Sequence, residues 1–312
     1  MKKLLLGIAA VCLAGFTFAQ DAPLWMRHSV ISPDGTTIAF TYKGDIYTVP
    51  VAGGRAMQIT TNPAYDTAPV WSPDSKRIAF ASDRMGSLDV YIVAKDGGEP
   101  RRLTTHSGSE TPLAFTDAGH VLFSAGIMPS AEAVVFPSNG QFNQVYRVSV
   151  EGGRPTMISS MPMECISINK EGAMLYQDKK GYEDYWRKHH VSPIARDIWM
   201  YTPGKEPQYR QLTTFGGEDR EPVWAPDGKT FYYLSEENGS FNIYRRTPGD
   251  AKAVQLTHYT KNPVRYLSAA TDGRLCYGFD GEIYTLLPGG EAQKVNISIV
   301  SDRNDKAIIR QI

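Results

Sequence analysis

The chain repeats one pattern of apolar and polar positions along most of its length. A full copy contains a Ser-Pro-Asp-Gly turn, an apolar triplet, an Ile-Tyr pair, Gly-Gly and Leu-Thr. β-Branched and aromatic residues favour strands, whereas Pro, Asp and Gly favour tight turns. Each copy is therefore predicted to form a small antiparallel sheet. The six apolar triplets are Ile38-Ala39-Phe40, Ile78-Ala79-Phe80, Val121-Leu122-Phe123, Met174-Leu175-Tyr176, Phe231-Tyr232-Tyr233 and Leu275-Cys276-Tyr277.

The spacing of the copies indicates the architecture. The aromatic residue of the Ile-Tyr pair recurs as Tyr47, Tyr91, Tyr146, Trp199, Tyr244 and Tyr284. A period of about 40–45 residues is typical of a four-stranded propeller blade. We therefore predict an all-β fold, a six-bladed β-propeller of four-stranded antiparallel blades over residues 25–297. The two longest steps indicate insertions in the third and fourth blades.

Two ways of closing the ring are compatible with this pattern. Residues 292–297 complete the sixth blade alone, or residues 24–27 cross over and lock it, which removes an exposed edge. The first is favoured because each copy supplies its own four strands. The tail, residues 298–312, is charged and then apolar again, and we interpret it as the start of a missing downstream domain.

The first 19 residues are predicted to be a signal peptide. Lys2 and Lys3 precede the uncharged apolar run 4–16, which is too short to span a bilayer. Small residues at positions 17 and 19 predict cleavage after Ala19. The alternative is an N-terminal core helix. We expect a periplasmic or secreted protein with no membrane span after cleavage.

Composition narrows the functional classes. The 312 residues include 33 Lys and Arg against 33 Asp and Glu, so there is no electrostatic case for nucleic acid or an anionic membrane as the main partner. Three cysteines are too few for a disulfide scaffold. Cys165 and Cys276 belong to copies two blades apart, too distant for a disulfide.

The sequence contains no recognised catalytic or cofactor motif: Gly-x-Ser-x-Gly, His-Glu-x-x-His, Cys-x-x-Cys and glycine-rich phosphate loops are all missing. We therefore expect no catalytic residue, metal or cofactor in this chain. His189-His190 is interpreted as a surface patch in preference to a metal site, because spacing supplies no further ligands. Acidic residues in the blade-to-blade loops are interpreted as solvated charge in preference to a general acid and base.

A polar residue stands directly before each Ile-Tyr pair. A ring of ligand groups and a structural acceptor at the start of the third strand are the two interpretations, and the structural one is favoured. These residues are Asp45, Asp89, Gln144, Asp197, Asn242 and Glu282.

One face of the ring is the predicted contact surface. Connections between the second and third strands share this face with the blade-to-blade connections, and both insertions, 126–142 and 178–196, belong to it. Mixed charge with aromatic residues suits peptide or protein contact. The alternative is a pair of functionally silent loops. The candidate peptide- or partner-contacting residues are Tyr65, Asp66, His106, Glu110, Tyr182, His189, His190, Glu218, Asp219, Arg220, Lys261 and Arg265.

The repeated phrase resembles the WD-like Pro-Asp repeat of TolB and of the tricorn protease propellers. Two longer stretches, residues 25–47 and 177–199, resemble secreted tricorn-like serine peptidases more specifically. The resemblance covers nearly the whole chain after the signal peptide. It implies the first, non-catalytic propeller of such a peptidase. In that family a second propeller, a PDZ-like domain and a serine peptidase domain follow.

The resemblance also implies partners. They are peptides or unfolded polypeptide, the downstream peptidase domains of the same parent chain, and further copies in a homo-oligomer. The catalytic Ser, His and acidic residues of the family would lie beyond this chain. The alternative is a free-standing TolB-like interaction propeller in the periplasm. A prolyl-oligopeptidase-type propeller is disfavoured, because those usually have seven or eight blades and precede an α/β-hydrolase domain.

Overall fold

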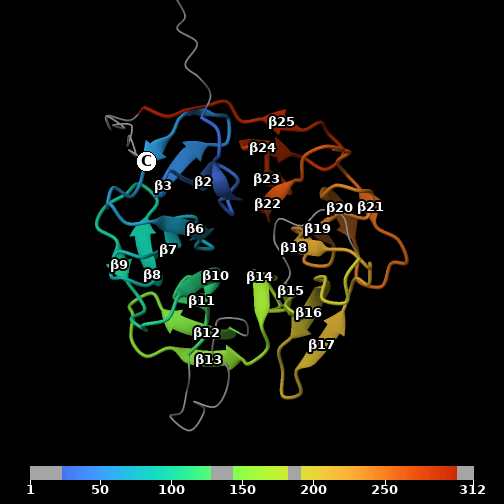
Figure 1. The fold of residues 1–312 in the computed structure, drawn as a ribbon, viewed down its shortest axis with the longest axis horizontal. Coiled ribbons are helices and arrows are strands. Elements are labelled where there is room, and N and C mark those ends of the chain that lie inside the picture. Colours follow the sequence, from blue (N-terminus) through green and yellow to red (C-terminus); the bar gives the residue numbers. More distant parts are fainter. Residues whose placement is uncertain (1–22, 128–142, 182–190, 301–312) are drawn as a thin grey trace, which may run out of the picture.

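Six four-stranded antiparallel sheets form a closed ring (Figure 1). The computed structural model describes residues 23–127, 143–181 and 191–300. No helix occurs in these three ranges. The innermost strands, β1, β6, β10, β14, β18 and β22, each contact the next one around the ring. The prediction of an all-β, six-bladed propeller is confirmed.

The first three blades follow the chain in order. Blade one contains β1 (Arg27–Ile31), β2 (Thr37–Tyr42), β3 (Asp45–Pro50) and β5 (Met57–Gln58). Blade two contains β6 (Asp66–Trp71), β7 (Arg77–Ser82), β8 (Asp89–Ala94) and β9 (Arg101–Arg102). Blade three contains β10 (Glu110–Asp117), β11 (His120–Ala125), β12 (Gln144–Ser149) and β13 (Thr156–Ser159).

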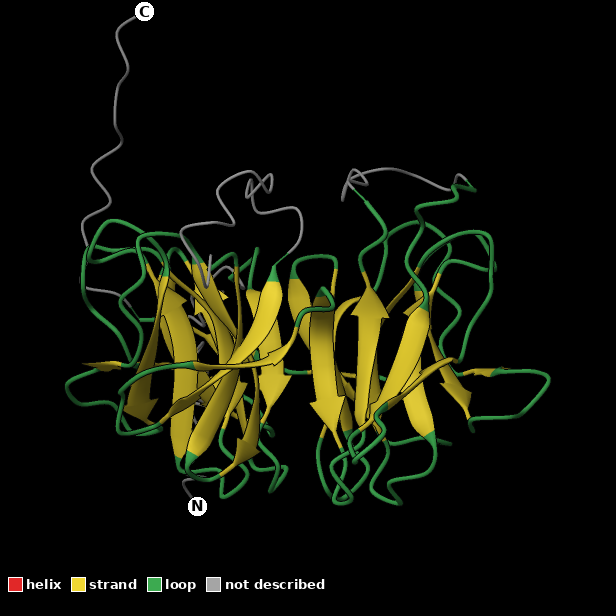
Figure 2. Cartoon of the chain, turned by 90° about the horizontal axis from the view of Figure 1, so that it is seen from below, coloured by secondary structure: helices red, strands yellow, loops and turns green. Residues whose placement is uncertain are grey.

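The other three blades repeat this order, and Figure 2 shows the strands running between two loop-bearing faces. Blade four contains β14 (Met163–Ile168), β15 (Met174–Asp178), β16 (Ile198–Thr202) and β17 (Gln208–Gln211). Blade five contains β18 (Asp219–Trp224), β19 (Phe231–Ser235), β20 (Asn242–Arg246) and β21 (Val254–Gln255). Blade six contains β22 (Arg265–Ala269), β23 (Leu275–Phe279), β24 (Glu282–Leu286) and β25 (Gln293–Lys294).

The apolar triplets are continuous because both faces of each blade are buried. Successive strand side chains point to opposite faces. In blade one, Ile38 and Phe40 pack into the cluster shared with blade six, whereas Ala39 packs into the cluster shared with blade two. The same alternation recurs around the ring, so each of the six hydrophobic clusters lies between two neighbouring blades.

The Ile-Tyr pair and the Leu-Thr pair stabilise the blades that carry them in different ways. The tyrosine packs across the strand pair on the last residue of the triplet, as Tyr47 does on Phe40 with ring centroids 5.8 Å apart. The threonine hydroxyl accepts a hydrogen bond from the backbone amide of the first residue of the pair. This bond joins Thr60 to Ile46 at 3.0 Å and recurs in blades two, four and five. Both motifs are therefore structural.

The innermost strands carry a repeated β-bulge. Five residues there have a left-handed backbone although none is glycine: His28, Ala68, Cys165, Glu221 and Tyr266. Such backbones persist only where the surroundings enforce them. Side chains from these positions reach the next blade. The Glu221 carboxylate accepts from the Leu267 amide at 2.8 Å, the Tyr266 ring packs on His28, and His28 Nδ1 lies 3.1 Å from the Thr67 hydroxyl.

The fourth strand of blade six comes from its own repeat, because β25 pairs with β24. The expectation that residues 292–297 complete this blade alone is wrong at its end, because Ile297 pairs with blade one. One addition was not predicted. After β25 the chain crosses to blade one, where β26 (Ile297–Ser298) pairs in parallel with β4 (Gly54–Arg55). The amides of Gly54 and Ala56 donate to the carbonyls of Asn296 and Ser298 at 2.8 and 2.9 Å. We call this parallel pair the latch.

Substitution of Gly53 by alanine tests whether the latch is formed. Gly53 has φ +86°, and a Cβ there would lie 2.5 Å from the Asn296 carbonyl oxygen. Gly97, at the same turn of blade two, has φ +91° with its nearest contact at 4.0 Å. The left-handed backbone lowers the free energy of unfolding of both alanine variants by about 1–2 kcal/mol. Only Gly53→Ala must also displace the latch. We expect it to lose about 1–3 kcal/mol more in urea-induced unfolding. Equal losses would contradict a formed latch.

Candidate functional site

At four of the six positions, the polar residue before the Ile-Tyr pair contacts a side chain of the outermost strand. Asp45 accepts from Gln58 Nε2 at 3.0 Å, and Asp197 accepts from Gln211 Nε2 at 2.9 Å. Asp89 pairs with Arg102, and Glu282 pairs with Lys294. This supports the structural interpretation, with one correction. In these blades the partner is a side chain of the fourth strand, rather than the turn at the start of the third.

The structure describes nine of the twelve predicted contact residues, and these lie in three environments. Tyr65 and Lys261 are exposed, and His106 and Arg265 are half-buried. Tyr182, His189 and His190 lie outside the described residues. The remaining five are at most 4% exposed, and these are Asp66, Glu110, Glu218, Asp219 and Arg220.

The burial of these five corrects the interpretation of solvated loop charge. Four of them lie in the first two positions of innermost strands, and Glu218 directly precedes β18. Buried charge is tolerated where it is paired. Both carboxylate oxygens of Asp66 accept hydrogen bonds from Arg84 Nη2, at 3.0 and 2.9 Å. The Arg84 guanidinium also lies over the Tyr91 ring. Arg84 was not predicted as part of this surface, because it lies in the turn after β7 and its partner Asp66 is 18 positions away in β6.

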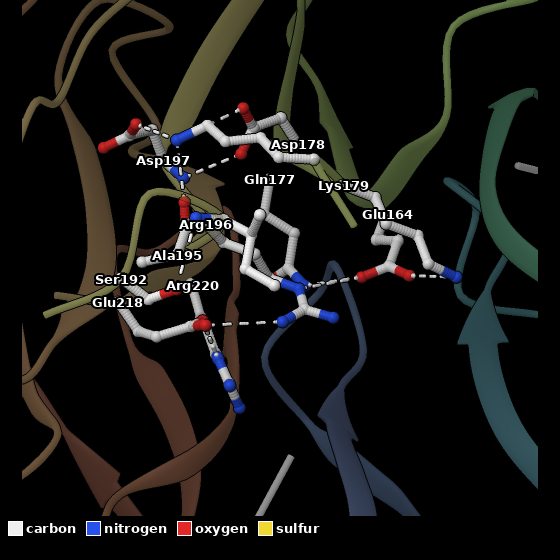
Figure 3. A network of polar contacts seen from close by, with 12 residues as sticks. Glu164, Gln177, Asp178, Lys179, Ser192, Ala195, Arg196, Asp197, Glu218 and Arg220 are labelled. Atoms are coloured by element: carbon white, nitrogen blue, oxygen red, sulfur yellow. Dashed lines mark hydrogen bonds and ion pairs between the residues drawn. The ribbon is translucent and has the colours of Figure 1, made fainter. Parts of the chain in front are cut away.

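An extended polar network joins blades four and five (Figure 3). Arg196 lies at its centre. Its Nε is 3.2 Å from Glu164 Oε2, and its Nη1 is 3.4 Å from Glu218 Oε1. Arg220 Nε lies 2.5 Å from the other oxygen of Glu218. Gln177 extends the network, because it donates to Glu164 and accepts from the Glu221 amide, both at 3.0 Å.

A second part of the network holds the two ends of the blade-four insertion together. Lys180, on the outgoing end, places its Nζ 2.5 Å from Asp197 Oδ2 and donates to the Ala195 carbonyl at 2.7 Å. Asp178 accepts from the Asp197 amide at 2.8 Å and from Trp199 Nε1 at 3.1 Å. The described ends of the insertion are thus fixed to each other and, through Arg196, to blade five.

Burial perturbs several carboxyl groups near these loops. It raises the pKa of Asp178 and of Asp197, while Lys180 opposes the rise in both. Burial also raises the pKa of Glu110 and of Asp219 to about 7. The neighbouring Asp89 raises the pKa of Glu110 further. Glu110 and Asp219 therefore change charge near neutral pH.

The arrangement of these polar residues is better suited to holding the loops in place than to catalysis. Within the described ranges, no three His, Cys, Asp or Glu residues are placed to hold a metal ion. The carboxylates of Glu164, Glu218 and Asp197 are engaged by arginine or lysine side chains. The described residues also include no helix long and apolar enough to cross a bilayer. Cys165 and Cys276 are both free, as their separation predicted.

Comparison with known proteins gives the same fold. Tricorn protease homolog 1 of Streptomyces coelicolor is 26% identical over 289 residues, which is 91% of this chain and 26% of that protein. The tricorn protease homolog of Saccharolobus solfataricus is 23% identical, over 90% of this chain and 26% of its own length. The chain therefore spans about a quarter of these curated relatives.

Solved structures agree at the level of the fold. The crystal structure of the tricorn protease superposes with a TM-score of 0.75 at 19% identity, covering 91% of this chain and 27% of that one. TolB from Acinetobacter baumannii gives 0.64 at 15% identity, covering 84% and 63%. The family described as the tricorn protease N-terminal beta propeller domain matches residues 23–292. The chain belongs to this family of propeller domains.

Proposed function

We propose that this propeller is the non-catalytic, substrate-handling part of a tricorn-like serine peptidase. It would admit or sort peptides and unfolded polypeptide for a peptidase domain outside this chain. The observation that carries the proposal is the family match over residues 23–292. The paired carboxylates of the blade-four and blade-five network favour a supporting role over catalysis in the propeller itself.

The proposed contact surface is the face that carries the second-to-third strand connections and the blade-to-blade connections. We call it the insertion face. The ends of the blade-four insertion are held there by Lys180 and Arg196. A fixed base is what a loop needs if it is to meet a substrate at a defined position. Secretion directed by residues 1–19 and assembly into a homo-oligomer belong to the same proposal.

A paired activity and binding assay tests this function. The purified chain is expected to bind a fluorescein-labelled unfolded polypeptide, such as reduced and carboxymethylated lactalbumin, in preference to the native protein. It is expected not to cleave that polypeptide, whereas a longer product of the same gene carrying a peptidase domain would. Cleavage by the 312-residue chain, retained on further purification, would overturn the non-catalytic role.

Loop replacement tests the insertion face separately. Exchanging residues 127–142 and 182–194 for short Gly-Ser turns should weaken binding of the unfolded polypeptide. The matched control replaces the outer turn 204–207 between β16 and β17, which lies away from this face. Unchanged binding after the first exchange would remove the insertions from the proposed contact surface.

A further inference from the structure

An aromatic groove lies on the insertion face of blade one. It has a volume of about 460 Å³, and its side-chain lining comes from three segments that meet there. They are the start of β1 with the residues before it, the end of β2 with the turn that follows, and the connection from β5 to β6. The lining residues used below are Leu24, Trp25, Arg27, Tyr42, Lys43 and Tyr65.

Trp25 is held open to solvent by its surroundings. Its side chain is 70% exposed, and its backbone is left-handed with φ +69°. The next residue, Met26, is buried between blades one and six and donates its amide to the Gly281 carbonyl at 3.1 Å. Gly281 fits closely there, since a Cβ on it would lie 3.0 Å from the Trp25 nitrogen. A bulky residue adopts this backbone rarely, and strain of this kind is concentrated at functional sites.

The other walls supply aromatic surface and positive charge. The Arg27 guanidinium lies 5.8 Å from the Trp25 ring, and Lys43 Nζ lies 5.8 Å from the Tyr42 ring. Tyr65 is 43% exposed, and its amide donates to Asp83 Oδ1 at 2.7 Å. No acidic side chain lines the groove among the described residues. The ionisable side chains of the lining other than tyrosine are therefore cationic.

We propose that this groove binds an extended acidic peptide, with an aromatic or large apolar side chain inserted between Trp25, Tyr42 and Tyr65. Carboxylates on either side of that residue would pair with Arg27 and Lys43. Tryptophan, tyrosine and arginine are the residues that dominate binding energy at protein interfaces, and clustered exposed apolar surface marks interaction sites. The inference rests on the proposed function and deepens it by naming a substrate class and its place of contact.

Calorimetric titration with two capped peptides tests the groove. The first is Gly-Glu-Phe-Glu-Gly and the second is Gly-Gln-Phe-Gln-Gly, so that only the charge differs. The acidic peptide is expected to bind more tightly, and the difference should shrink as salt is raised. Trp25→Ala or Tyr65→Ala should weaken binding of both peptides about tenfold or more. The Arg27→Gln, Lys43→Gln double variant should abolish the preference for the acidic peptide.

Tyr209→Ala is the matched control, because this tyrosine is 42% exposed but lies on the outer strand β17. It should bind as the unmodified protein does. Circular dichroism confirms that each variant is folded. Failure of the acidic peptide to bind, or unchanged binding by both Trp25→Ala and Tyr65→Ala, would overturn the inference. Binding of maltoheptaose in place of either peptide would overturn it as well.

The two proposals fail in different ways. In one outcome the chain binds the unfolded polypeptide, but the acidic peptide either does not bind or binds the groove variants as tightly as the unmodified protein. The proposed function then stands, and the groove is not its contact site. If the acidic peptide binds through the groove while a longer gene product shows no peptidase activity, the groove inference stands and the peptidase role fails.

Discussion

Replacing Arg196 by alanine is expected to lower the free energy of unfolding by about 3 kcal/mol. Breaking a buried ion pair by removing one partner is worth roughly 3–5 kcal/mol, because the other charge remains buried. Glu218 is fully buried and would lose one of its two guanidinium partners, and Glu164 would lose its contact as well. The lower end of the range applies because Arg220 still pairs with Glu218.

Urea-induced unfolding followed by circular dichroism measures this loss. The matched control is Arg101→Ala, which removes a 2.7 Å ion pair with Glu151 whose two side chains are 48% and 72% exposed. Exposed pairs contribute about 0–1 kcal/mol, so the control should change little. Similar losses in the two variants would mean that the network between blades four and five does not stabilise the ring.

Replacing Glu110 by glutamine is expected to stabilise the protein above pH 7 and to change it little below pH 5. The folded-state pKa of Glu110 is about 7, against an ordinary value of 4.5. A carboxyl group whose pKa is raised on folding binds its proton more tightly in the folded state. Its contribution to stability is therefore complete below pH 4.5 and is lost as pH rises through 7. Since one pKa unit corresponds to about 1.36 kcal/mol, this loss approaches about 3 kcal/mol above pH 7.

The measurement is the difference in unfolding free energy between Glu110→Gln and the unmodified protein from pH 5 to pH 9. The comparison with the unmodified protein is needed because the titration of His28 changes stability with pH in the opposite direction. Burial and Arg27 lower the pKa of His28 to about 4, so its contribution grows as pH rises from 4 toward 6.5. Glu151→Gln, at an exposed carboxylate, is the control and should give a flat difference. A flat difference for Glu110→Gln would show that this carboxyl is ionised normally.

Much of the blade could be predicted because its determinants are local. The triplet, the aromatic pair and the Thr hydroxyl each act within one sheet or against the next, and their spacing repeats with the blade. The Asp of the Ser-Pro-Asp-Gly turn also behaves locally, since Asp34 Oδ1 accepts from the Thr36 amide at 3.0 Å. Repetition makes such signals visible in a single sequence.

The charged groups at the strand ends could not be predicted in the same way. A charge in a short polar segment looks solvated unless its partner is known, and partners such as Arg84 and Arg196 lie far away in the sequence. Arg196 and Glu218 are 22 positions apart and belong to different blades. The latch was missed for a related reason, because two-residue strands such as β4 and β26 carry no periodic pattern. Such contacts depend on the assembled ring.

The latch also determines how the ring would respond to a pulling force. A load applied at the C-terminal end reaches the rim of blade one through β26 before it reaches blade six. The strands of the latch are parallel, and backbone hydrogen bonds join them along their length. A pull along β26 would therefore shear these bonds together, whereas a pull outward from the rim would open them one after the other. The propeller would resist tension along its circumference more strongly than tension away from it.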